Sequence, residues 1–254
     1  MSDGWAESAA AWIADMGNGG DFGRACVLDR PMLERIEAGR FTTALDVGCG
    51  EGRFCRMLAE RGIGTVGIDP TEALIDEARR RDPPGDYRIG RAEQLDFPDA
   101  SFDLVVSYLS LIDIPDLTRA IAEMARVLRP GGSLLIANLT SFNTAAQPSL
   151  GARLGFRPAV DRYFDERPEW VSWRGIRVQN WHRPLGTYMA LLLEQALELR
   201  HFAEPAPYAG NPLRIARYRR APWFLIMEWR KPDATAPGSR DIVRPPRRQQ
   251  GAQA

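Results

Sequence analysis

Short apolar runs alternate with longer stretches of helical hydrophobic spacing along the first half of the chain. This alternation is typical of parallel strands joined by crossover helices, so it predicts an α/β fold. The apolar runs predict strands at residues 44–47, 65–69, 87–89, 104–107 and 133–137. The helical spacing predicts helices between them, at residues 53–61, 72–80 and 117–128. The last helix is expected to stop at the run Arg129-Pro130-Gly131-Gly132.

The segments on either side of this alternation have a different character. Ahead of it, residues 5–14 and 27–37 are spaced like helices, with turn-forming residues at 17–20 between them. After it, residues 162–181 are rich in aromatic side chains, and the pattern around Arg174-Gly175 predicts a hairpin. The rest of the chain predicts a helix after Pro184, strands at 199–204 and 222–229, and a short basic helix at 211–220 whose arginines form a solvated face.

These changes of character predict the domain organisation. We expect a helical cap at residues 1–40 and one domain at residues 41–231, with an insertion at about residues 150–183. From residue 232 to 254, a composition of proline, glycine, arginine and glutamine offers no core-forming pattern and predicts a disordered tail.

Composition narrows the class of partner. The chain has 254 residues, 44% of them hydrophobic, and it balances 33 basic against 33 acidic side chains. A chain without net charge has no global field to hold nucleic acid or an anionic membrane, so neither partner is expected. The three cysteines show no metal-ligand spacing, and we expect no metal. Because no apolar run has membrane-spanning length and no signal-peptide pattern opens the chain, we expect a cytoplasmic protein. The sequence does not indicate its oligomeric state.

The first expected strand leads into a glycine-rich turn of pattern D-x-G-x-G-x-G at residues 46–52. Glycines at a strand-to-helix turn let the backbone approach a ligand closely. A dinucleotide fingerprint would place its third glycine at position 53, where the chain has Arg53. Asp46 and Glu51 would also repel a pyrophosphate, whereas a cationic ligand such as S-adenosylmethionine, which has no phosphate, fits the turn better.

A second acid follows where an adenosine site needs one. Asp69 ends the next expected strand, 17 residues after Gly52, which leaves room for one crossover helix. Its carboxylate can accept hydrogen bonds from both hydroxyls of a ribose. Either acid alone would be read as a solvated loop carboxylate, but together with the glycine turn they predict a cofactor site.

With these features the chain resembles the class I S-adenosylmethionine-dependent methyltransferases, and most closely their small-molecule branch of the ubiquinone and menaquinone biosynthesis type. The glycine turn carries the likeness together with residues 90–98, 101–107 and 126–132. The resemblance implies a doubly wound, Rossmann-like sheet of seven strands, mostly parallel, with an antiparallel last strand. It also implies S-adenosylmethionine as cofactor, a small-molecule substrate, and an insertion that covers the substrate.

The resemblance implies a set of cofactor-binding residues. They are Arg24, Asp46, Gly48, Gly50, Gly52, Asp69, Ala92, Glu93, Ser107 and Tyr108. In the family's arrangement the turn holds the methionine end, Asp69 the ribose, Ala92 with Glu93 the adenine, and Ser107 with Tyr108 the junction near the methyl group.

The resemblance leaves the residues for two of these cofactor contacts open. Arg24 is the expected partner of the methionine carboxylate, since family members often supply an arginine ahead of the first strand, and Arg30 competes with it. Arg91 stands where the family usually has an acid that bonds the adenine amino group. Glu93 or backbone groups are expected to replace that contact.

Substrate-side chemistry is expected after the fifth strand. Trp170, Trp173 and Trp181 either stack on a planar, apolar substrate or pack the hairpin onto the sheet. His182 is the candidate catalytic base, because its ordinary pKa suits proton transfer from a hydroxyl or amine. Its alternative interpretation is a hydrogen-bonding residue that holds the hairpin to the following helix, and His201 is expected to be structural.

Two other function classes stay open. A nicotinamide-dependent oxidoreductase shares the strand and the glycine turn but conflicts with Arg53 and with the acids around the turn. A non-catalytic S-adenosylmethionine-binding protein differs from the enzyme only in turnover. The sequence favours a methyltransferase that acts on a small apolar or aromatic molecule.

Overall fold

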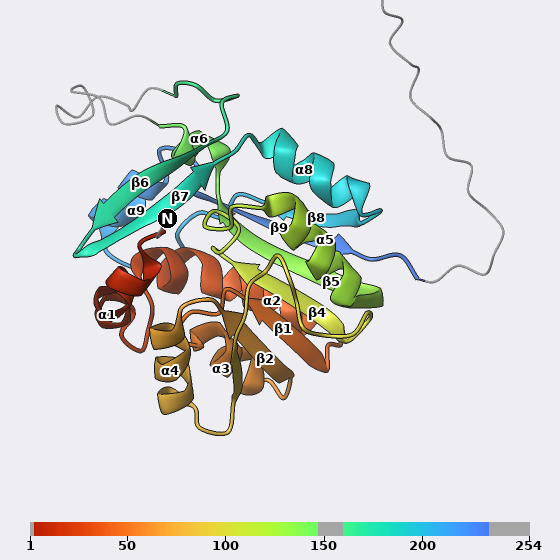
Figure 1. Cartoon of the computed structure of the whole chain (residues 1–254). Helices are drawn as coiled ribbons and strands as arrows, with labels where there is room; N and C mark the ends of the chain where they lie inside the picture. Colours follow the sequence, from red (N-terminus) through yellow and green to blue (C-terminus); the bar gives the residue numbers. More distant parts are fainter. Residues whose placement is uncertain (1–2, 147–159, 234–254) are drawn as a thin grey trace, which may run out of the picture.

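The computed structural model describes residues 3–146 and 160–233, and Figure 1 shows how their elements are arranged around one large sheet. The strands follow the order β3-β2-β1-β4-β5-β9-β8. In that order they span Asp86–Ile89, Gly64–Asp69, Thr43–Val47, Phe102–Tyr108, Leu128–Leu139, Phe224–Arg230 and Glu198–Ala203. The first five are parallel, and β9 lies antiparallel between β5 and β8. The predicted doubly wound, mostly parallel sheet is confirmed.

Both faces of the sheet are covered, because its central strands are apolar on both sides. Helices α5 (Leu117–Val127) and α8 (Leu185–Glu194) pack on one face, against a core that includes Val105. Elements η1 (Arg24–Leu28), α2 (Asp29–Ala38) and α3 (Arg53–Ala59) pack on the other, against Leu104 and Val106. Successive residues of β4 thus point to opposite cores, as the twofold periodicity of a strand requires.

The other elements gather beyond the carboxyl ends of the parallel strands. Strands β6 (Arg167–Trp173) and β7 (Ile176–His182) form the predicted antiparallel hairpin. Helix α1 (Trp5–Met16) packs between β7 and α4 (Glu72–Arg81), with Trp12 and Leu74 in one small core with Val178. The short helices α6 (Ser141–Thr144) and α9 (Pro212–Tyr218) complete this end (Figure 1).

Several boundaries differ from the sequence prediction by a few residues, and two differences change the type of structure. Helix α5 ends at Val127, and the predicted stop at residues 129–132 lies within β5, where Gly131 takes a φ of 77°. The helix expected at residues 27–37 begins at Asp29 and is preceded by the π-helical turn η1. Most of the predicted tail and part of the predicted insertion, residues 234–254 and 147–159, lie outside the described residues. The division of the chain at residues 40 and 231 stays a prediction.

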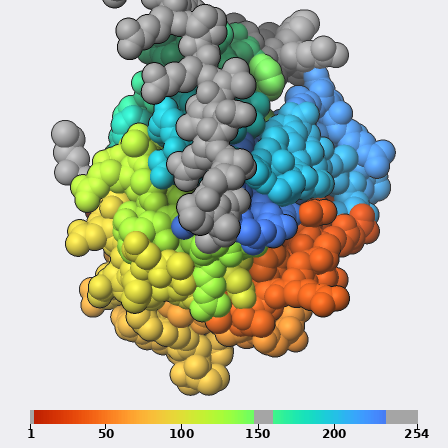
Figure 2. Space-filling view, turned by 90° about the vertical axis from the view of Figure 1, so that its right-hand side faces the viewer, coloured from red at the N-terminus to blue at the C-terminus, as the bar shows by residue number. Residues whose placement is uncertain are grey.

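Segments distant in sequence meet on the face shown in Figure 2, where orange residues of the N-terminal part adjoin blue residues near residue 230. One ion pair joins them: Arg35 of α2 lies 2.6 Å from Glu228 of β9. Within residues 3–146 and 160–233, none of the helices has the length and apolar character of a membrane span.

Candidate functional site

The site forms where the strand order reverses. Strand β2 follows β1 on one side and β4 lies on its other side, so the loops after β1 and β4 diverge at the carboxyl edge of the sheet. Ligands of doubly wound sheets bind in the crevice that this divergence leaves. A cavity of about 630 Å³ lies there, bordered by Gly50, Asp69 and Tyr108 among others. That volume is in the range of small-molecule sites, about 300–1,000 Å³.

The glycine turn brings β1 close to the loop after β4 and leaves space for a ligand. A Cβ atom on Gly48 would lie 2.4 Å from Cβ of Ser110, so only glycine permits this approach. Gly50 has a φ of 55°, and the nearest atom to a Cβ placed on it is Trp12 Nε1, at 3.7 Å. Both glycines border the cavity, whereas Gly52 begins helix α3 against the ring of Tyr87 and is not among the cavity-lining residues of the described chain. The turn therefore offers an open cradle at Gly50.

Asp69 faces the cavity with a fixed carboxylate. Its Oδ2 accepts a hydrogen bond from the Gly50 amide at 3.0 Å, and its Oδ1 accepts one from the Thr71 amide at 2.8 Å. Burial raises the pKa of this carboxyl, and the two backbone hydrogen bonds act against that rise. Each oxygen can accept a further bond, so the geometry suits a ligand that carries two neighbouring hydroxyls.

Asp46 lies deeper, under the turn. It borders a smaller space of about 40 Å³, which shares Trp12, Arg24 and Gly50 with the large cavity. Its Oδ2 accepts a weak bond from the thiol of Cys55 at 3.4 Å, and its Oδ1 is buried without a partner in the described chain. Burial raises the pKa of Asp46 to about 7, and the charges of Asp69 and Glu51 add to the rise. A cationic group of a ligand would pair with the unpartnered oxygen of Asp46. The carboxylate therefore fits the ammonium group of S-adenosylmethionine.

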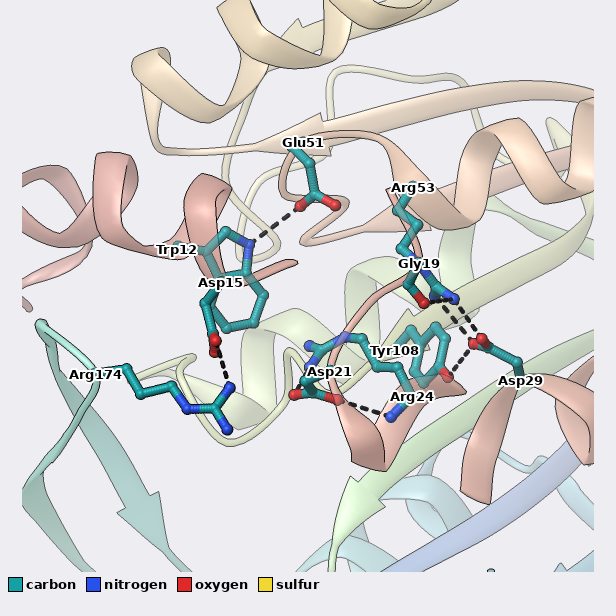
Figure 3. A network of polar contacts seen from close by, with 10 residues as sticks. All are labelled: Trp12, Asp15, Gly19, Asp21, Arg24, Asp29, Glu51, Arg53, Tyr108 and Arg174. Atoms are coloured by element: carbon teal, nitrogen blue, oxygen red, sulfur yellow. Dashed lines mark hydrogen bonds and ion pairs between the residues drawn. The ribbon is translucent and has the colours of Figure 1, made fainter. Parts of the chain in front are cut away.

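The charges flanking the turn are bonded within the protein, as Figure 3 shows. Glu51 is buried and accepts a hydrogen bond from Trp12 Nε1 at 3.1 Å. The guanidinium of Arg53 pairs with Asp29 and donates to the Gly19 carbonyl at 2.9 Å. Arg53, at the position of the missing dinucleotide glycine, therefore joins α3 to the N-terminal segment.

Of the two candidate arginines, Arg24 borders the cavity. Its guanidinium lies 3.0 Å from Asp21 and 4.8 Å from the ring centre of Trp12 (Figure 3). Arg30 is exposed, with its guanidinium 4.2 Å from the ring centre of Tyr208, and is not among the described residues that line the cavity. Arg24 therefore lies at the cavity, and its use as the partner of the methionine carboxylate stays a prediction.

The expected adenine end is bordered by Ala92, Glu93 and Arg91. Arg91 lies 3.0 Å from the Glu93 carboxylate, so the residue that departs from the family's pattern is paired with the acid two positions later. Arg91 thereby holds Glu93, whose side chain is 13% exposed, at this wall of the cavity. The pairing suits the sequence expectation that Glu93 replaces the missing acid.

The two residues expected near the methyl group are placed differently. Tyr108 borders the cavity, and its hydroxyl donates a hydrogen bond to Asp29 at 2.7 Å. Ser107 is fully buried, with its hydroxyl 2.7 Å from that of Ser110, and it is not part of the described cavity lining. Ser110 takes the place at the cavity wall instead, and its hydroxyl donates to the Val47 carbonyl.

His182 is bonded at both ring nitrogens. Nδ1 lies 2.7 Å from the Thr144 hydroxyl, and Nε2 lies 2.9 Å from the Tyr163 carbonyl. Because a carbonyl only accepts, the proton is assigned to Nε2, and Nδ1 faces the Thr144 hydroxyl, which also lies 3.3 Å from the Ser141 carbonyl. The ring is buried, and His182 is not among the described residues around the cavity. This arrangement favours the alternative interpretation, a residue that ties the hairpin to neighbouring segments, over the catalytic base.

The aromatic wall has different members from those expected. Of the three tryptophans of the hairpin, Trp173 borders the cavity. Arg177 lies over the ring of Trp170 at 4.2 Å, and Arg183 lies over that of Trp181 at 4.8 Å. Further rings come from the C-terminal part, where Tyr218 and Trp223 stack with ring centres 4.5 Å apart.

The arginines of helix α9 are exposed, as expected, and two of them also meet the cavity. Arg214 and Arg217 border the cavity and lie over the rings of Phe22 and Trp223, at 5.5 and 5.3 Å. Their spacing of three residues is the signal for a shared helix face. The sequence could not show that this face turns to the cavity, because the rings beneath it come from distant segments.

Sequence reasoning also missed a polar pair at the cavity. Asp113, in the loop after β4, accepts a hydrogen bond from the side-chain amide of Asn180 in β7. Both border the cavity. The described residues contain no cluster of three or more histidine, cysteine or acidic side chains that could hold a metal ion.

Comparison with known proteins agrees with this geometry. Residues 45–136 match the family model described as a methyltransferase domain. The chain is 36% identical over 126 residues to a malonyl-[acyl-carrier protein] O-methyltransferase of Serratia marcescens, covering 48% of this chain and 49% of that protein. It is 29% identical over 172 residues to a demethylmenaquinone methyltransferase of Beutenbergia cavernae, covering 66% and 70%.

The likeness extends to solved structures. An S-adenosylmethionine-dependent methyltransferase from Mesorhizobium loti superposes with a TM-score of 0.68 at 28% identity, over 79% of this chain and 96% of that one. The chain spans about half the length of several curated relatives that it matches. The matched domain, the sheet order and the cradle at the switch point agree. Residues 45–136 therefore match a methyltransferase domain, in a fold similar to that of S-adenosylmethionine-dependent methyltransferases, a family whose cofactor is S-adenosylmethionine.

Proposed function

We propose that this protein transfers the methyl group of S-adenosylmethionine to a small apolar or aromatic molecule. The observation that carries the proposal is the cavity of about 630 Å³, whose lining combines two kinds of group. It presents the open turn at Gly50 and the fixed carboxylate of Asp69 together with the rings of Trp173, Tyr218 and Trp223. A cofactor site continuous with an aromatic wall supports transfer to an acceptor that lies against those rings.

The residues that would hold the cofactor have distinct proposed uses. Asp69 would hold the ribose hydroxyls, Arg24 the methionine carboxylate and Asp46 the ammonium group. Glu93, held by Arg91, would receive the adenine. When bound, the cofactor supplies a methyl group on a sulfonium that is already a good leaving group.

The chain's own contribution to the rate is alignment. Fixing two reactants within about 3–3.5 Å of each other replaces a bimolecular encounter and can lower the barrier by several kcal/mol. Asp69 and Glu93 are anchored by hydrogen bonds or an ion pair, so their side chains can orient a ligand without first being ordered. The aromatic rings of the cavity lining would reduce the contact of water with a bound acceptor.

Calorimetry and a turnover assay test the proposal separately. Purified protein should bind S-adenosylhomocysteine and S-adenosylmethionine, with NADH producing no heat. It should then form S-adenosylhomocysteine with at least one member of a panel of phenols, quinols and amines. Binding without turnover across the panel would favour a non-catalytic binding protein, and binding of NADH alone would favour an oxidoreductase.

A further inference from the structure

Asp113 occupies a fixed position in the loop that follows β4. The Ile112 carbonyl accepts a hydrogen bond from the Trp181 amide at 2.6 Å. Arg183 donates to the carbonyls of Ile114 and Pro115, at 2.7 and 3.0 Å. Strand β7 and the residue after it therefore fasten this loop on both sides of Asp113. The half-buried carboxylate borders the large cavity.

Asp113 lacks the ion pair that two other aspartates of the cavity lining make, and within the described chain it shares this feature with Asp3 and Asp69. Asp15 is paired with Arg174, and Asp21 with Arg24. Asp113 has no basic side chain within 4.0 Å in the described chain, and the only hydrogen bond that its carboxylate makes there is the one that Oδ1 accepts from Asn180. The second oxygen, Oδ2, is left for a group inside the cavity.

The surroundings of Asp113 raise the pKa of its carboxyl toward the neutral range. Burial is the largest influence and raises its pKa to about 8. The negative charges of Asp69 and Asp3 add to the rise, while the hydrogen bond from Asn180 and the charge of Arg24 oppose it. Asp113 is thus within electrostatic range of both Asp69 and Arg24, the residues proposed for the two ends of the cofactor.

We propose that Asp113 is a catalytic residue whose Oδ2 accepts the proton of a hydroxyl or amine on the acceptor while that group is methylated. This inference rests on the proposed function. The acceptor's oxygen or nitrogen lone pair forms the bond to the methyl carbon, and the electron pair of the broken carbon–sulfur bond stays on sulfur. The acceptor's proton passes to Asp113 and then to solvent when the product leaves.

The assignment also names the acceptor class. A carboxylate acceptor is already ionised at neutral pH and needs no base, whereas a phenol, alcohol or protonated amine does. A group with a pKa near the working pH is the most effective base for such an acceptor. A base at Asp113 therefore implies an acceptor whose nucleophilic atom carries a proton. That acceptor would lie against the aromatic side chains of the cavity.

Proton release on ligand binding tests the position of Asp113 without any turnover. A sulfonium next to Asp113 favours its ionised form, so S-adenosylmethionine should release more protons at pH 7 than S-adenosylhomocysteine, whose sulfur is neutral. Calorimetry in buffers of different ionisation enthalpy measures this difference. Asp113→Asn should abolish it, and Asp116→Asn, an exposed cap residue three positions along the same loop, should retain it. An equal release for both ligands in the wild type, or a difference that survives in Asp113→Asn, would overturn the proposal.

Turnover then tests proton transfer, with the acceptor found in the panel. At saturating cofactor the wild-type rate should rise with pH through one ionisation, and Asp113→Asn should lose that rise and about 10²-fold or more in kcat. Asn180→Ala removes the hydrogen bond that favours the charged form, so the rise should move to higher pH. Equal melting temperature and S-adenosylhomocysteine affinity identify folded variants. Rates of Asp113→Asn within twofold of wild type would contradict a base, while failure of every protein to bind the cofactor would contradict the proposed function instead.

Discussion

Three aspartates of the site carry the same side chain but differ in what surrounds each carboxylate. Asp69 is held by two backbone amides, Asp46 is buried with one oxygen unpartnered, and Asp113 is bonded by one amide of the hairpin. Sequence reasoning could find the first two because they end strands beside the glycine turn. It could not find Asp113, since its partner Asn180 is 67 residues away and meets it only through the docking of the hairpin.

Asp69→Ala should weaken binding of S-adenosylhomocysteine by about 10- to 100-fold. The change removes the acceptor of the ribose hydroxyls, and a hydrogen bond to a charged group contributes about 1.5–3 kcal/mol. Titration calorimetry measures the dissociation constants, and Asp116→Asn provides a matched variant outside the cavity lining of the described chain. Equal affinities in wild type and Asp69→Ala would contradict the ribose assignment.

Asp46 should make the stability of the ligand-free protein depend on pH. Its folded-state pKa of about 7 lies above its ordinary value of 3.8, so the folded state holds the proton more tightly than the unfolded chain. The contribution of Asp46 to the free energy of unfolding is then highest below about pH 4 and is lost as the pH rises through about 7. Asp46→Asn should therefore stabilise the protein by about 2 kcal/mol more at pH 8 than at pH 5, measured by urea unfolding. A pH-independent effect of the substitution would show that Asp46 is ionised in both states.

At the scale of elements, the sheet could be predicted and the walls of the cavity could not. Strand positions follow from apolar runs that are buried on both faces, a local property of the sequence. The cavity wall depends on contacts between elements: Arg217 of α9 reaches it because its guanidinium lies over Trp223, and Trp173 reaches it through the turn of the hairpin. The role of His182 depends in the same way on Thr144 and Tyr163, both of them distant in sequence.

His182→Asn should lower the stability of the fold and leave the turnover rate nearly unchanged. Its two ring nitrogens join the hairpin to Thr144 and to the Tyr163 carbonyl, and the loss of a buried hydrogen bond costs about 1–3 kcal/mol. We expect a lower free energy of unfolding by that amount, with turnover per folded molecule changed by less than about threefold. Urea unfolding and steady-state assays on the same preparation measure both. A loss of kcat of about 10²-fold in fully folded His182→Asn would restore the catalytic base.

At the scale of the whole molecule, the cavity is closed by segments from both ends of the chain. Trp12 of α1 bonds Glu51 of the glycine turn, Arg24 of η1 lies between Trp12 and Tyr108, and Trp223 precedes the last strand. A ligand in the cavity would contact several of these segments at once. Ligand binding should therefore stabilise these segments together and leave the opposite edge of the sheet nearly unchanged.

Hydrogen exchange with S-adenosylhomocysteine should show this coupling. Slower exchange is expected in the glycine turn and equally in α1, η1 and the loop at residues 110–115, because all of them border one cavity. Helix α8, which contributes none of the described residues that line the cavity, serves as the internal reference. Trp12→Phe keeps an aromatic ring beneath Arg24 but removes the donor to Glu51, and a buried carboxylate without its donor is unfavourable. In that variant the protection of α1 should fall while that of residues 110–115 persists. Protection confined to the glycine turn in the wild type would show that the N-terminal segment does not close over the cofactor.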